Sequence, residues 1–105
     1  MLRRQTLAFC LLLVVDRALA EPTALCGIDA SNRRVVRISA TLLRGEPRYT
    51  CVFVWSVDFD NGSKRENERC EAEVVDGTTN GTVCQRAYPK TIKSAALTQY
   101  RCTRS

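Results

Sequence analysis

The chain carries few of the side chains that an active site needs. It contains no histidine in 105 residues, so neither a Ser-His nor a Cys-His pair can be built, and the imidazole acid–base chemistry of small secreted ribonucleases is missing. It also has no glycine-rich phosphate-binding loop. Glu71 and Glu73 could act as paired carboxylates, but their spacing is more typical of the solvated face of an amphipathic strand. We expect a protein that is not an enzyme and uses no cofactor.

Cysteine is the other reactive side chain of the sequence. Leaving aside Cys10 in the N-terminal apolar run, five remain, namely Cys26, Cys51, Cys70, Cys84 and Cys102. Without histidine or a C-x-x-C pair they do not indicate a metal site, and outside the cell they are expected to form disulfides. Any of the five could be the unpaired one, and the other four can pair in three ways, so the connectivity stays open. The odd thiol could bridge to a second molecule, form a covalent dimer of this chain, or stay a buried thiol.

The N-terminus has the three-part pattern of a secretory signal peptide over residues 1–20. A basic start "MLRR" precedes the apolar run 7–15 and the small-residue site "ALA" at 18–20. The apolar run is too short to span a bilayer, which needs about 20 residues. We expect a soluble, secreted, extracellular protein with one domain over residues 21–105 and no membrane insertion.

Two further features fit an extracellular chain. Asn61 and Asn80 each begin an Asn-Gly-Ser/Thr acceptor for N-glycosylation, and Asn-Gly is also a strong turn signal. Removal of residues 1–20 leaves 13 basic and 10 acidic side chains, a charge of +3. This mild surplus is spread along the chain, so nucleic acid is not an expected partner.

Alternating apolar residues predict strands as the main elements. Residues 36–42 and 49–59 both have period two, and the second run is rich in aromatic and β-branched side chains. The break "RGEP" between them predicts a hairpin. Shorter strands are expected at 70–75, 82–88 and towards the C-terminus, where "KSAAL" could instead form one helical turn. Residues 21–32 are expected to form an irregular arm, and 58–69 a long charged loop.

The predicted fold class is mainly β, a small disulfide-linked antiparallel sheet of four to five strands with little helix. In such a protein, loops held on rigid strands are the usual binding surface. The arm around Cys26 and two turns are the candidates. The candidate binding residues in the turns are Leu42, Leu43, Arg44, Gly45, Glu46, Pro47, Tyr88, Pro89 and Lys90. Leu42 also continues the alternating apolar face, and a residue in that position is more often part of the core.

The run "VVRISATLLRG" followed by an aromatic strand resembles the central hairpin of the secreted cystatins, inhibitors of papain-like cysteine proteases. In that likeness "TLLRG" (41–45) matches the inhibitory Gln-x-Val-x-Gly turn, "YPK" (88–90) the second loop, and Gly27 the N-terminal arm. The spacing C-x13-C-x17-C is also close to that of the last three family cysteines. The chain departs from the family at Thr41, Leu43 and Lys90, has no room for the family's long helix, and places Cys51 earlier than the family's first cysteine.

Two function classes follow. The first is a secreted effector that sequesters or blocks an extracellular protein such as a receptor, a cytokine or a complement factor. The alternative, which the resemblance implies, is an inhibitor of papain-like cysteine proteases that acts through the 42–47 turn. A hormone-like ligand that dimerises through its odd cysteine is a third, smaller possibility. The altered turn residues favour the first class.

Overall fold

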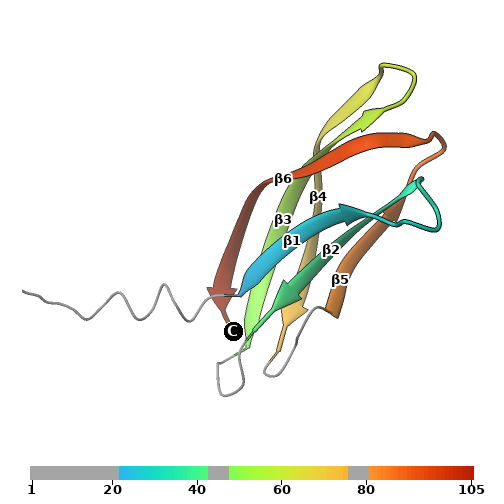
Figure 1. The fold of residues 1–105 in the computed structure, drawn as a ribbon. Coiled ribbons are helices and arrows are strands. Elements are labelled where there is room, and N and C mark those ends of the chain that lie inside the picture. The colour runs from blue at the N-terminus through green and yellow to red at the C-terminus, as the bar shows by residue number, and fades with distance from the viewer. Residues whose placement is uncertain (1–21, 43–47, 76–80) are drawn as a thin grey trace, which may run out of the picture.

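The computed structural model describes residues 22–42, 48–75 and 81–105. They form six strands and no helix (Figure 1). In chain order the strands are β1 (Thr23–Ile28), β2 (Val35–Thr41), β3 (Tyr49–Phe59), β4 (Lys64–Val74), β5 (Gly81–Ala87) and β6 (Ile92–Arg104). The prediction of a mainly β, antiparallel, disulfide-linked chain with little helix is confirmed.

The strands form two three-stranded antiparallel sheets, where one sheet of four to five strands was expected. The first, which we call sheet A, has the order β1-β2-β5, and the second, sheet B, has the order β4-β3-β6. The expected hairpin is therefore wrong, because β2 and β3 belong to different sheets and do not pair. Two amphipathic strands joined by a break can pair edge to edge or face each other across a core, and the alternation alone does not distinguish these arrangements.

The core lies between the two sheets and follows from the period of two. Every second residue of β3 from Tyr49 to Phe59 is buried, and the inward face of β2 is buried in the same way. The largest fully buried side chains are Trp55, Phe53 and Ile38. Apolar residues from both sheets join one cluster, so the two inner faces stabilise each other by removing apolar surface from water.

Two segments that were expected to be irregular are strands. Residues 23–28 form β1, whose Ala24, Cys26 and Ile28 turn towards the core. The small side chains and Gly27 hide that alternation in the sequence. The expected loop 58–69 shrinks to a turn around residues 60–63, because β4 already begins at Lys64. The first residues of β4 are exposed, so only backbone pairing with β3 marks them as strand.

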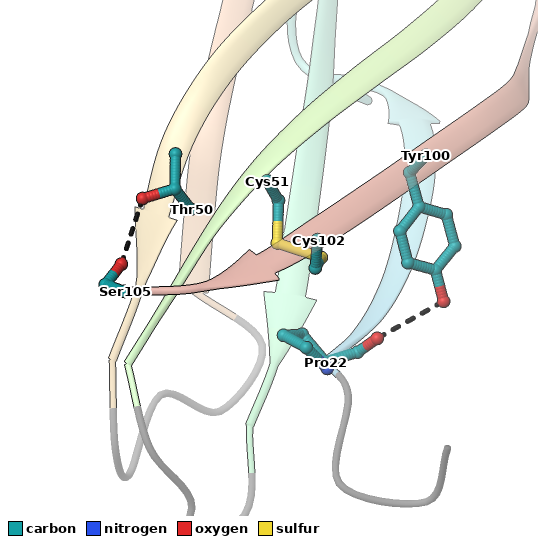
Figure 2. Close-up of a disulfide and its surroundings, with 6 residues drawn as sticks. All are labelled: Pro22, Thr50, Cys51, Tyr100, Cys102 and Ser105. Carbon is teal, nitrogen blue, oxygen red and sulfur yellow. Dashed lines mark hydrogen bonds between the residues drawn. A yellow bond between two sulfur atoms is a disulfide. The ribbon is translucent and has the colours of Figure 1, made fainter. Parts of the chain in front are cut away.

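Side chains link the two sheets at their edges. β4 lies beside β5 and β1 beside β6, but neither contact belongs to a hydrogen-bonded sheet. The Cys70–Cys84 disulfide joins β4 to β5. At the other edge the Tyr100 hydroxyl donates a hydrogen bond to the Pro22 carbonyl at 3.2 Å (Figure 2).

The second disulfide, Cys51–Cys102, joins directly paired positions of β3 and β6 within sheet B. Cys26 is the free cysteine among the described residues and is half-buried. Cys26 on β1 and Cys84 on β5 are both paired with Ile38 of the central strand β2, one from each side. This connectivity selects one of the disulfide pairings that the sequence leaves open.

We expect the two disulfides to contribute unequally to stability. Cys51–Cys102 spans 51 residues and Cys70–Cys84 spans 14, so the loop-entropy model gives about 4 and about 3 kcal/mol. Urea unfolding of Cys51→Ala/Cys102→Ala and Cys70→Ala/Cys84→Ala variants measures both losses. A larger loss in the second variant would mean that linking the sheets matters more than loop length.

We also expect Cys26 to carry a free thiol that reacts slowly in the folded protein. Burial raises the pKa of Cys26, so its thiol should be alkylated slowly in the folded protein and rapidly in urea. Peptide mapping after iodoacetamide treatment without reductant would place the label on Cys26. A dimer band on non-reducing gels that Cys26→Ser removes would show instead that this cysteine bridges two copies of the chain.

Candidate functional site

The structure does not bring the predicted binding residues together. Leu42 and Tyr88 are only 2 % and 5 % exposed and belong to the core, which corrects their assignment as surface contacts. Pro89 and Lys90 are exposed. Tyr88 comes directly after the residue that pairs with Val35, at the start of β2. Leu42 comes directly after the end of β2, so the two candidate residues are separated by the length of this strand, about 23 Å. Residues 43–47 and Asn80 lie outside the described residues.

The outer face of sheet B carries a hollow of about 330 Å³. Its floor is the middle of β3, where Val52 and Val54 point away from the core and are half-buried. Its walls come from the two flanking strands. The lining residues are Val52, Val54, Asn67, Arg69, Gln99 and Arg101. In register, Arg69 and Gln99 lie opposite Val54, and Arg101 lies opposite Val52.

Two β-bulges shape this hollow from both sides. On β4 two residues, Glu66 and Asn67, face the single Ser56, and on β6 the extra residue is Thr98. Asn67 has a φ of 60°, a left-handed conformation that asparagine tolerates better than most residues. Bulges bend the strands that carry them, and Figure 1 shows β6 bending midway along its length. The register shift on β6 falls between the residues paired with Val54 and Trp55, next to the valine floor.

The polar side chains of the hollow have no partners among the described residues. Arg37 pairs with Asp29 at 2.9 Å, and Arg86 pairs with Glu68 at 3.2 Å. By contrast, neither Arg69 nor Arg101 forms an ion pair or side-chain hydrogen bond in the described part of the chain. Two guanidinium groups are thus left beside an apolar floor, with all their donors open to a ligand.

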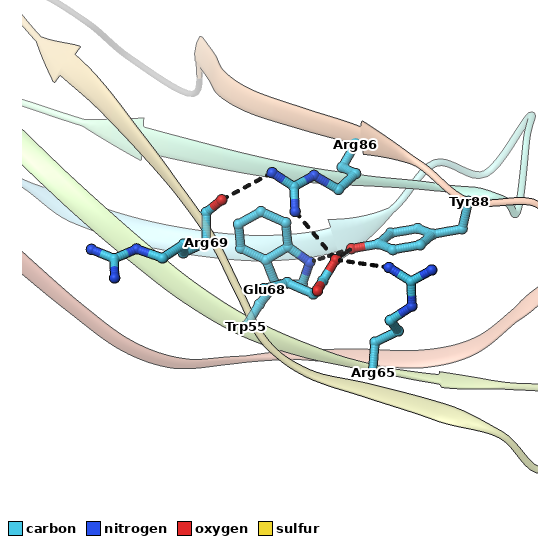
Figure 3. Close-up of polar contacts among 6 residues, drawn as sticks. All are labelled: Trp55, Arg65, Glu68, Arg69, Arg86 and Tyr88. Atoms are coloured by element: carbon cyan, nitrogen blue, oxygen red, sulfur yellow. Dashed lines mark hydrogen bonds and ion pairs between the residues drawn. The ribbon is translucent and has the colours of Figure 1, made fainter.

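A polar network on the inner side of β4 holds this strand in place (Figure 3). The buried indole N–H of Trp55 donates to the Tyr88 hydroxyl at 3.0 Å, and that hydroxyl donates to the Glu68 carboxylate at 2.8 Å. Arg86 donates to the same carboxylate and, at 3.0 Å, to the backbone carbonyl of Arg69. The side chain of Arg69 extends away from this network. The network fixes the backbone from which Arg69 reaches the hollow.

The network also shifts the titration of Tyr88. Burial, followed by the hydrogen bond to the Glu68 carboxylate, raises its pKa from 10 to about 12. The neutral phenol is the form that can donate to a carboxylate. Tyr88 therefore acts as a structural hydrogen-bond donor, and sequence analysis misplaced it as a surface residue.

Other surface features are less developed. A second hollow, of about 380 Å³, lies over sheet A beside Leu25, Gly27 and Arg37, but Arg37 is already paired with Asp29. Glu71 and Glu73 are exposed on β4, and Glu73 pairs loosely with Arg48 at 3.7 Å. In the segments that the structure describes, no group of three or more histidine, cysteine, aspartate or glutamate residues is placed to hold a metal ion.

No protein-family model, curated protein or solved structure matches this chain. Within the described segments, no helix has the length and hydropathy to span a bilayer.

Sequence reasoning missed the hollow on sheet B, although one signal of it is present. Val52 and Val54 occupy the outward positions of β3, where the alternation calls for polar side chains. Two β-branched apolar residues at outward positions indicate either a strand that is covered on both faces or a strand whose outer face contacts another molecule. The bulges that gather Asn67, Arg69 and Arg101 around them leave no comparable mark in the sequence.

We expect Tyr88→Phe to cost about 1–3 kcal/mol of unfolding free energy, because it leaves the buried indole N–H of Trp55 without an acceptor. Urea unfolding at neutral pH measures this loss. Tyr100→Phe is the matched control, since it removes one hydroxyl at a side chain that is 38 % exposed. An equal loss in both variants would contradict the structural role of the Tyr88 hydroxyl.

The raised pKa gives this contribution a pH dependence. Tyr88 is harder to ionise in the folded protein, so its stabilising effect is fully present below pH 10 and is lost as the pH rises towards 12. We expect the wild type to lose more stability between pH 10 and 12 than Tyr88→Phe does. Parallel unfolding curves across this range would contradict the assignment.

Proposed function

We propose that this chain is a secreted, non-enzymatic module that binds an extracellular protein through the outer face of sheet B. The observation that carries the proposal is the hollow over Val52 and Val54, an apolar floor flanked by two guanidinium groups that have no ion-pair partner among residues 22–42, 48–75 and 81–105. Solvent-facing apolar residues gathered in a concave site indicate a contact surface.

The size of this face fits a protein partner. Three strands about 4.8 Å apart and about 36 Å long present on the order of 500 Å². A standard protein–protein interface buries about 800 Å² on each side. The face and its rim therefore approach the area that one partner contributes.

The position of the face also supports binding. β3 is the central strand of sheet B, and its inner side is packed into the core, so the surface is preorganised and little conformational entropy is lost on binding. The Asn61 acceptor lies in the β3–β4 turn, where its Oδ1 accepts hydrogen bonds from Ser63. β3 runs about 17 Å from Val54 to its end at Phe59, so a glycan on Asn61 would be attached beyond the hollow.

The test is capture from a panel of purified extracellular proteins that includes receptors, cytokines, complement factors and papain-like proteases. The wild type is compared with Val54→Lys, which places a charge on the apolar floor. We expect a retained panel protein to bind Val54→Lys at least tenfold more weakly, a change of about 1.4 kcal/mol.

Gln85→Lys is the matched control, because it adds the same charge to the exposed side of β5 in sheet A. It should leave the affinity unchanged. If Gln85→Lys weakens binding while Val54→Lys does not, the binding face is sheet A and the proposal is wrong. A panel in which no protein is retained also contradicts the proposal.

A further inference from the structure

The two arginines of the hollow are placed so that they can hold one group together. They stand on opposite sides of β3 and two residues apart in register, with Arg69 opposite Val54 and Arg101 opposite Val52. Sheet geometry puts their Cα atoms about 12 Å apart. Two arginine side chains that lean over the valine floor can close this distance and meet above it.

The chemistry of the walls selects an anion. Each guanidinium offers a planar set of N–H donors that matches a carboxylate, and the bidentate geometry adds direction as well as strength. The amides of Asn67 and Gln99 line the same hollow and can donate to the same group. The valine floor excludes water from one side, which strengthens charge-assisted contacts.

The carboxylates beside the hollow disfavour a polyanion. Asp58 and Glu71 occupy outward positions on β3 and β4 of the same sheet, and Glu73, which is loosely paired with Arg48, lies next to them. A chain of sulfated sugars would place further negative charges against these carboxylates, and like charges in proximity are repelled. One isolated carboxylate with apolar neighbours avoids this repulsion and covers the valines.

We propose that the hollow clamps a single carboxylate, carried on an extended peptide segment of the partner and flanked by apolar side chains, between Arg69 and Arg101. The inference rests on the proposed function, since it names the group that the outer face of sheet B recognises. The bound peptide segment lies along β3, because the hollow covers two successive outward residues of this strand.

The first experiment uses the full secreted protein and two short blocked peptides. One peptide has a central glutamate between valine residues, and the other has glutamine at that position. We expect the glutamate peptide to shift the Nε–Hε NMR signals of Arg69 and Arg101 in a saturable way, with at least fivefold weaker binding of the glutamine peptide. Equal binding of the two peptides would overturn the clamp.

Heparin-derived tetrasaccharide is titrated in parallel to test the disfavoured polyanion. If the tetrasaccharide saturates the same two arginines more tightly than the glutamate peptide, the face recognises sulfated sugars and the inference is wrong. We expect weaker shifts that do not centre on these arginines.

The second experiment returns to the panel protein that the wild type retains. We expect Arg69→Gln and Arg101→Gln each to weaken binding about tenfold, whereas Arg104→Gln, which removes the same charge from β6 outside the hollow, should change it less than twofold. If Val54→Lys abolishes binding but neither arginine substitution does, the proposed function stands and the carboxylate clamp is wrong. If none of these substitutions on sheet B matters, both fail.

Discussion

The hydrogen bond from the Tyr88 hydroxyl to the Glu68 carboxylate is the contact around which the rest of the structure is organised. β4 and β5 meet without a backbone ladder, so side chains must close this edge of the core. One carboxylate receives Tyr88 and Arg86 while Tyr88 accepts the buried indole N–H of Trp55. The buried indole N–H of Trp55 and the Tyr88 hydroxyl both have hydrogen-bond partners, which avoids the cost of a buried donor without a partner.

This inner network and the outer hollow are two sides of one strand. Successive residues of β4 point to opposite faces, so Glu68 enters the network while its neighbours Asn67 and Arg69 line the hollow. Arg86 holds the backbone carbonyl of Arg69 from the inside. The packing that stabilises the core also holds the backbone at Arg69, so less backbone entropy is lost when this residue meets a ligand.

The sequence predicts the parts of the fold that depend on burial and misses those that depend on backbone geometry. The alternation in β2 and β3 gives their inward residues correctly, because the core removes one apolar face of each from water. β1 and the first residues of β4 are not predicted as strands. Their side chains are small or charged and show no apolar alternation, so only the backbone pairing identifies them. The sequence also does not predict that β2 and β3 lie in different sheets, because a period of two is the same for strands that pair and for strands that face each other across a core. The hollow depends on two bulges at one level of β3, and a bulge is set by register between distant strands.

The small number of charged groups in the hollow determines which ligands it can select. Two guanidinium groups that find no partner in the described part of the chain contribute nothing to its packing through ion pairing there, and each would gain little from one exposed carboxylate. Over an apolar floor the balance changes, because a partner that covers the valines also removes water from around the arginines. A carboxylate in that position is attracted strongly, whereas a neutral side chain would bury both guanidiniums without compensation. The penalty for the wrong group, more than the gain from the right one, makes such a site selective.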